Sequence, residues 1–154
     1  MTDIYSTTNA PAPSESTIAA FFRGEVDATM LDREWSGAFD ESRDAAGAVV
    51  SRQLRTSKGT QEFAVTSAHC VRLVDAVLQS ELSHEALDAV CFAVESSDGF
   101  TWDADAADGE RIARALFLLG TPEVNYPLCD RVLRKVRHYL ATGEDQLTAA
   151  DLKA

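Results

Sequence analysis

The sequence has little of what marks secreted or membrane proteins. It contains only three cysteines (Cys70, Cys91 and Cys129), an odd number with no metal-ligand or redox spacing. No basic segment followed by an apolar run begins the chain, so we expect no signal peptide. The longest apolar run, 89–94, is far shorter than the ~18 residues of a membrane span. We therefore expect a cytoplasmic protein with reduced thiols and no membrane association.

Metal and cofactor motifs are also missing. None of the three histidines pairs with another at helical spacing or lies near a cysteine in a zinc pattern. An EF-hand calcium loop needs Gly at its sixth position and Glu at its twelfth. In a loop that begins at Asp103, these positions hold Asp108 and Arg114, so the calcium-binding pattern is not met. Residues 56–60 lack the paired glycines of a phosphate-binding loop. We predict that the protein needs no metal and no cofactor.

Positive charge is scarce, since 14 Lys and Arg face 25 Asp and Glu for a net charge of −11. Such a field repels nucleic acids and anionic membranes and attracts basic surfaces. We expect a basic protein partner and no direct nucleic-acid binding. The alternative is that the acidity only serves solubility in a regulatory or scaffold subunit. The oligomeric state stays open.

The 154 residues, 45% of them hydrophobic, suit one domain. Residues 1–14 are rich in Ser, Thr, Ala and Pro and predict a flexible leader. Residues 15–143 form the predicted helical domain, and 144–154 a polar tail with at most one short turn from Thr148.

Apolar residues recur mostly at helical spacing, which predicts an all-α fold of five to seven helices. Three starts have clear N-cap residues, namely Asp27, Thr66 or Ser67, and Ser83, and a further helix is expected over 41–55. The only strand candidate is 62–66, and a small β-hairpin near Phe63 or Phe100 stays compatible with the pattern.

Two helices close the predicted domain. The one that ends at Gly120 is apolar on nearly all sides, so Leu116 and Phe117 should both be deeply buried. The last runs from Asp130 to Gly143.

The segment 95–110 is the most suggestive part of the chain because it holds six acids and no base. A loop tryptophan is either a plug of the core, which we favour for Trp102, or an exposed contact anchor. If the segment is a contact surface, its carboxylates imitate phosphate spacing and steer a basic partner. The predicted partner-binding residues are Asp98, Trp102, Asp103, Asp105, Asp108 and Glu110.

The last predicted helix carries a run of bases. A solvated face explains such a run more simply than an anion site, and the helix could also pair with the protein's own acids. The run consists of Arg131, Arg134, Lys135, Arg137 and His138. An enzyme remains an alternative, with a site assembled around Cys129, His138 and Tyr126.

Segments 98–103 (Asp-Gly-Phe-Thr-Trp-Asp) and 121–128 (Thr-Pro-Glu-Val-Asn-Tyr-Pro-Leu), followed by a basic amphipathic helix, resemble small acidic bacterial immunity proteins of toxin–immunity pairs. The resemblance covers the C-terminal third of the chain. It implies a non-enzymatic protein that neutralises a toxin by binding it, and it carries over no individual binding residue.

Overall fold

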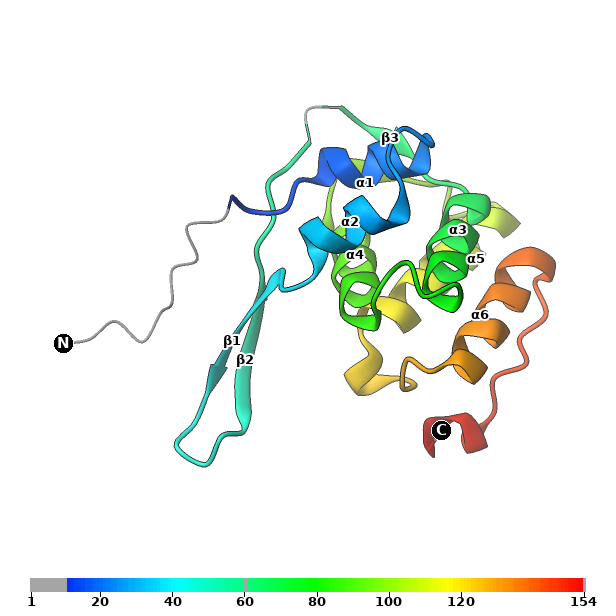
Figure 1. Cartoon of the computed structure of the whole chain (residues 1–154). Helices are drawn as coiled ribbons and strands as arrows, with labels where there is room; N and C mark the ends of the chain where they lie inside the picture. Colours follow the sequence, from blue (N-terminus) through cyan, green and yellow to red (C-terminus); the bar gives the residue numbers. More distant parts are fainter. Residues whose placement is uncertain (1–10, 60, 154) are drawn as a thin grey trace.

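The computed structural model describes residues 11–59 and 61–153, and within them helices predominate (Figure 1). The α-helices are α1 Glu15–Phe22, α2 Ala28–Trp35, α3 Ser67–Leu78, α4 His84–Ser96, α5 Ala107–Gly120 and α6 Asp130–Thr142. The strands are β1 Phe39–Arg43, β2 Val49–Leu54, β3 Phe63–Ala64 and β4 Phe100–Thr101. Two short 3-10 helices, η1 Pro122–Val124 and η2 Ala149–Lys153, complete the described part.

The helix starts follow from capping residues. Asp27, Thr66 and Ser83 each accept a hydrogen bond from the backbone amide three residues later, which satisfies an amide that has no partner within the helix. These predicted starts are confirmed. The last helix ends just before Gly143, also as predicted, but its N-cap is Cys129 rather than Asp130.

The helix predicted over 41–55 is wrong, because the segment forms the antiparallel hairpin of β1 and β2. The Asp44 carboxylate accepts hydrogen bonds from the amides of Ala46 and Ala48, both at 2.9 Å, which closes the turn. Gly47 there has a φ of +87°, which residues with a side chain rarely adopt. The turn residues and the β-branched Val49 and Val50 favour a hairpin, although the spacing of the apolar residues also fits a helix.

β3 and β4 pair in parallel, with Phe63 opposite Phe100 and Ala64 opposite Thr101. The strand candidate at 62–66 is therefore confirmed, but its partner lies far along the chain and the pair is not a hairpin. The predominantly helical fold with two small sheets is mixed α/β, so the all-α prediction is wrong in its strand content.

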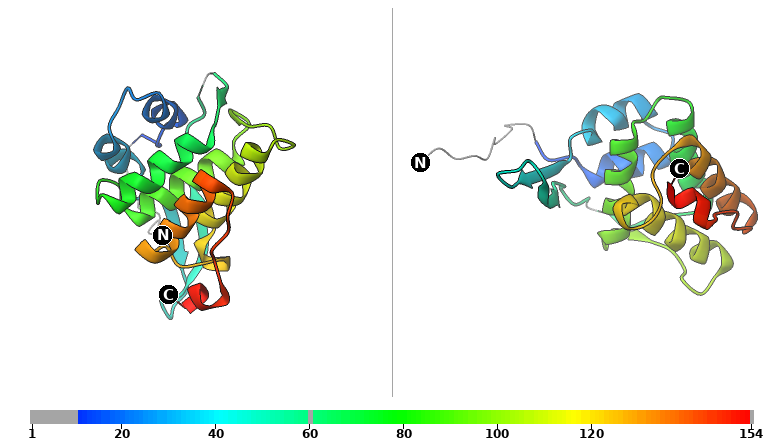
Figure 2. Two further views of the ribbon diagram at one scale, coloured as in Figure 1. Left: turned by 90° about the vertical axis from the view of Figure 1, so that its right-hand side faces the viewer. Right: turned by 90° about the horizontal axis from the view of Figure 1, so that it is seen from below.

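The helices α3, α4 and α5 form the centre of the fold (Figures 1 and 2). α1 and α2 pack on one side of them and α6 packs on the other, and the core lies at these contacts. α4 and α5 pack especially closely, since a Cβ at Gly120 would stand 2.9 Å from the Phe92 amide nitrogen. Leu116 is fully buried as predicted, but Phe117 is 45% exposed. The prediction for Phe117 is wrong because α3, α4 and α6 cover most of its helix but leave the side that carries Phe117 open to solvent.

The C-terminal segment folds back on α6. Asp151 of η2 is completely buried, and its carboxylate lies 2.9 Å from the Arg131 Nε and 2.8 Å from the Lys135 Nζ. The Thr148 amide donates a further hydrogen bond to it at 2.8 Å. These contacts attach the segment after Gly143 to the helical body.

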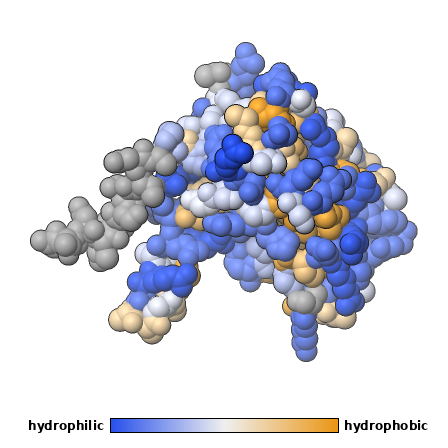
Figure 3. Space-filling view, in the orientation of Figure 1, coloured by the Kyte–Doolittle hydropathy of each residue, from blue (hydrophilic) through white to orange (hydrophobic). Residues whose placement is uncertain are grey.

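The hairpin of β1 and β2 projects from that body, as Figure 1 and the right-hand view of Figure 2 show. Phe39 and Leu54 at its root are half-buried, whereas residues 43–53 are exposed. An isolated two-stranded ribbon is marginally stable in water, so its root contacts matter. Space-filling Figure 3 shows the arm standing clear of the body, with an apolar end below hydrophilic strands.

Candidate functional site

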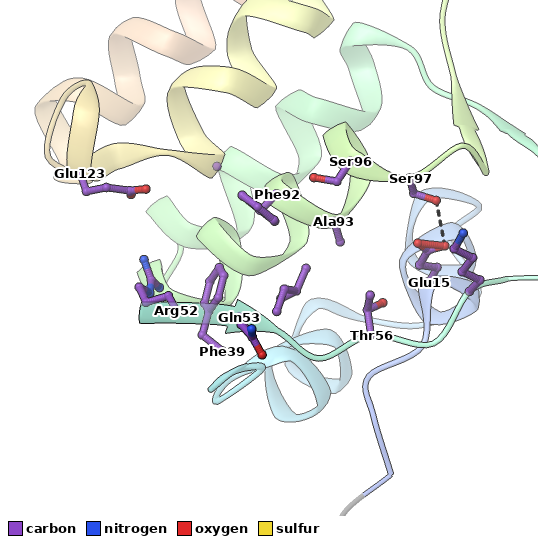
Figure 4. A pocket seen from close by; sticks show the side chains of 13 residues that line it. Glu15, Phe39, Arg52, Gln53, Thr56, Phe92, Ala93, Ser96, Ser97 and Glu123 are labelled. Atoms are coloured by element: carbon purple, nitrogen blue, oxygen red, sulfur yellow. Dashed lines mark hydrogen bonds between the residues drawn. The ribbon is translucent and has the colours of Figure 1, made fainter. Parts of the chain in front are cut away.

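A groove of about 550 Å³ lies between the hairpin root and α4 (Figure 4). One wall consists of β2 and the segment after it, and the other consists of the C-terminal half of α4. Phe39, Leu54 and Phe92 make its middle apolar, while charged side chains lie toward its ends. A volume of this size falls in the usual range for ligand clefts.

The Arg52 guanidinium joins the hairpin to α4. It lies 3.2 Å from the Asp88 carboxylate and 3.5 Å from that of Glu41, and its Cζ is 3.9 Å from the centre of the Phe39 ring. Phe39 in turn packs edge-on against Phe92, with 6.0 Å between the ring centres. The root is therefore held by one arginine and one aromatic pair.

Asp88 is an unusual partner for this arginine because its side chain is nearly buried. The pKa of Asp88 is raised to about 6, because burial and the nearby carboxylates of Glu123 and Glu85 raise it by more than the Arg52 guanidinium lowers it. The Oδ1 atom of Asp88 is buried and has no hydrogen-bond partner among the described residues. The Asp88 carboxylate therefore keeps one oxygen without a hydrogen bond and changes its protonation state near pH 6.

Glu15 closes the other end of the groove. Its side chain is only 4% exposed and accepts hydrogen bonds from the Ser97 hydroxyl at 3.0 Å and the Gly59 amide at 3.4 Å. Ser97 is the C-cap residue that follows α4, and Gly59 lies after β2, so the carboxylate connects three segments. We therefore interpret Glu15 as structural.

The predicted acidic contact residues share one exposed segment. Asp98, Asp103 and Asp105 lie in the loop, whereas Asp108 and Glu110 belong to the first turn of α5. Acids there are stabilised by the helix dipole. None of the six acids of 95–110 forms an ion pair with a described residue.

Two of these acids also have structural roles. The Asp103 carboxylate accepts the Asp105 amide at 3.0 Å, and Asp108 accepts the Ser67 amide at 3.2 Å at the start of α3. A Cβ at Gly109 would stand 1.7 Å from the Asp103 carbonyl oxygen. The loop is thus held tightly against α5 while its carboxylates face solvent.

The two aromatic residues of this region lie differently from a surface cluster. Phe100 is 6% exposed and packs with Phe22 and Phe63, with 6.3 Å between ring centres in both pairs. Trp102 is half-buried and packs against the core. The core location favoured for Trp102 agrees with the structure in part, since one portion of its side chain packs on the core and the rest stays accessible to a partner.

The bases of α6 are largely occupied by the protein's own acids. Besides the pairs with Asp151, Arg137 contacts the Asp75 carboxylate of α3, with 3.2 Å between Nη2 and Oδ2. The His138 Nε2 lies 3.5 Å from Glu144. These acids come from α3 and the C-terminal segment, so the face is a set of internal ion pairs rather than an open anion site.

The thiol and the imidazole of the alternative enzyme site do not come together. Cys129 precedes α6 and His138 lies nine residues further, which is about 13 Å along the helix axis. Burial raises the pKa of the Cys70 thiol to about 12 and that of Cys91 well above its usual value, so neither is a nucleophile at neutral pH. All three cysteines are free thiols.

Within residues 11–59 and 61–153, no group of three or more His, Cys, Asp or Glu side chains could hold a metal ion. Over the same residues, no helix combines the length and apolar character needed to cross a bilayer. Comparison with protein-family models, curated proteins and solved structures finds no match. The resemblance to immunity proteins therefore stays a prediction.

Sequence reasoning did not find the groove. Its walls come from five separate segments, and the pattern that predicted a helix over 41–55 hid the strand that forms one of them. The turn signal at Asp44 to Gly47, followed by Val49 and Val50, could have indicated the hairpin.

Proposed function

We propose that this protein is a non-enzymatic binding module for a basic protein, acting as an acidic inhibitor of the immunity type. The observation that carries the proposal is the distribution of charge. Eight Lys or Arg side chains are in ion pairs within the described chain, and none of these pairs reaches the acids of 95–110. In a chain with a net charge of −11, these six acids therefore carry negative charge that no described base neutralises by direct contact.

Uncompensated acids favour a basic partner in two ways. Like charges within 95–110 repel one another, and a cationic surface would relieve that repulsion. The field would also speed association at low salt, when screening is weak. Half-buried Trp102 would supply a limited apolar contact beside Asp103.

The projecting hairpin supports the same proposal. Val49 and Val50 are 43% and 62% exposed near its end, and almost none of the arm packs on the protein's own core. A ribbon that contributes little to its own core is well suited to a contact between proteins.

The test begins with a partner captured on the immobilised full chain from host extract at low salt. Association is then measured at two salt concentrations for wild type and for the double variant Asp103→Asn, Asp105→Asn. We expect slower association and a flatter salt dependence for the variant, with an unchanged or higher melting temperature.

A matched control removes two exposed charges elsewhere, with Glu81→Gln and Asp130→Asn. If the control slows association as much as the loop variant, only net charge matters and the loop is not the contact surface. If the loop variant melts lower and binds unchanged, the acids are structural and the proposal fails.

A further inference from the structure

The free edge of β2 borders the groove. Arg55 donates its backbone amide to the Ala38 carbonyl at 2.8 Å. With the register of the ladder, this places the backbone hydrogen bonds at the opposite pairs 38/55, 40/53 and 42/51. In an antiparallel ladder the residues between these pairs direct their N–H and C=O groups away from the partner strand. Those residues are Arg52, Leu54 and, on the continuation of the strand, Thr56.

The other edge of this strand pairs with β1, although the Ala38 amide bonds to the Trp35 carbonyl and not to that of Arg55. Beyond Ala38, Ser57 donates its amide to the Pro13 carbonyl at 2.8 Å and accepts the Glu15 amide at 3.0 Å, in parallel pairing. No backbone hydrogen bond to another described residue involves Arg52, Leu54 or Thr56 on the opposite side. Within the part of the chain that the structure describes, three donors and three acceptors therefore stand unpaired beside an apolar groove.

The two edges of the hairpin differ in charge. Three of the five residues of β1 are charged (Asp40, Glu41 and Arg43), whereas Arg52 is the only charged residue among the six of β2. Charged side chains on an edge strand oppose the addition of another strand, so β1 is protected and β2 is not.

We propose that an extended segment of a basic partner protein adds to β2 as a third strand and places its apolar side chains in the groove. The inference rests on the proposed function for the sign of the partner's charge. The unpaired groups of residues 52–56 extend over about 13 Å, the length of about five residues of a strand. Alternate side chains of that segment would face Phe39, Leu54 and Phe92.

Charge decides between a partner and a second copy of this chain. Two copies would each bring a net charge of −11 to the contact, whereas Glu123, exposed and without an ion pair among the described residues, lies at one end of the groove. A basic side chain of the added strand would find its counter-ion there. The groove is lined by two acids and two bases, of which Glu15 and Arg52 already have partners within the protein (the other two are Glu123 and Lys58). The net charge of −11 therefore favours a basic extended segment as the occupant of the edge.

The experiment uses the full chain labelled for NMR and two synthetic seven-residue peptides with blocked ends, one alternating valine with lysine and the other valine with glutamate. In the free protein, the amides of Arg52, Leu54 and Thr56 should exchange with solvent faster than those of Gln53 and Arg55. The lysine peptide should bind and slow exchange at these three edge amides, and the glutamate peptide should not.

A proline removes one edge donor without breaking the ladder with β1, because the Thr56 amide faces outward. Thr56→Pro should weaken binding of the lysine peptide about fivefold, the worth of one hydrogen bond, whereas Thr56→Ala keeps the amide and should stay within twofold of wild type. Ser96→Trp, at an exposed position that lines the groove, should also weaken binding by filling it. Melting curves establish that each variant is folded.

The outcomes separate this inference from the proposed function. If the lysine peptide changes only residues 98–110 and binds both Thr56 variants equally, strand addition is refuted and the acidic binding function stands. If the glutamate peptide protects the edge equally well, the strand site stands and the basic partner does not. Edge protection that rises with protein concentration alone would assign the edge to a second copy and overturn the inference, as would the absence of edge protection with either peptide.

Discussion

The buried Asp88 makes the stability of the hairpin root depend on pH. Its pKa of about 6 lies above the ~3.9 of an exposed aspartate, so folding favours the protonated carboxyl. That contribution to stability is fully present below about pH 4 and is lost as pH rises through 6. A difference of two units corresponds to at most about 3 kcal/mol in the free energy of unfolding.

Asp88→Asn imitates the protonated carboxyl at every pH. We expect its free energy of unfolding, relative to wild type, to become more favourable between pH 4.5 and 7.5, by up to about 2 kcal/mol. Urea denaturation at several pH values measures this difference, in which the titration of other groups cancels. Asp40→Asn, which removes a 60%-exposed carboxylate from the same hairpin, is the control and should show no such trend.

The opposite trend would refute the reasoning. If Asp88→Asn loses more than about 1 kcal/mol relative to wild type between pH 4.5 and 7.5, the ion pair with Arg52 outweighs the cost of burying the charge. Asp88 would then be ionised and favourable in the folded protein.

Three further predictions concern the body of the fold. Leu116→Ala should reduce the free energy of unfolding by about 2–5 kcal/mol, whereas Phe117→Ala at its exposed neighbour should cost less than about 1.5 kcal/mol, and equal urea midpoints for the two would contradict the burial of Leu116. Gly109→Ala should lower the calorimetric melting temperature because its Cβ would collide with the Asp103 carbonyl, and a wild-type melting temperature would show that the loop yields freely. Asp151→Asn should speed limited proteolysis after Gly143, because it removes the charge that pairs with Lys135. Lys135 also holds the pKa of Asp151 below its usual value, so the ion pair is lost as pH falls through that lowered pKa. An unchanged cleavage rate in the variant would exclude the anchoring role.

Local signals explain the parts of the fold that the sequence predicted. Thr66 and Ser83 combine an N-cap with a following apolar face, and both helices begin there. The failure at 41–55 has a local cause as well, because Ala46, Val49 and Val50 match helical spacing although all three are exposed. Periodicity reports which residues share a face, but not whether anything covers that face.

The candidate site was less predictable because tertiary contacts create it. Asp98 and its acidic neighbours could be singled out from local charge, and they are exposed. The groove depends on Arg52 reaching Asp88, 36 residues further along the chain. The pairing of Lys135 with Asp151 likewise turned an apparent basic face into an internal contact.

The close contact between Gly120 and the Phe92 backbone has a mechanical consequence for the groove. Because α4 and α5 are so closely packed there, we expect the wall of the groove that carries Phe92 to be rigid. The opposite wall is the hairpin, which Arg52 and Phe39 attach to α4. We expect larger incoming side chains to be accommodated by tilting the hairpin, at the expense of these two contacts, while the packing between α4 and α5 stays as it is.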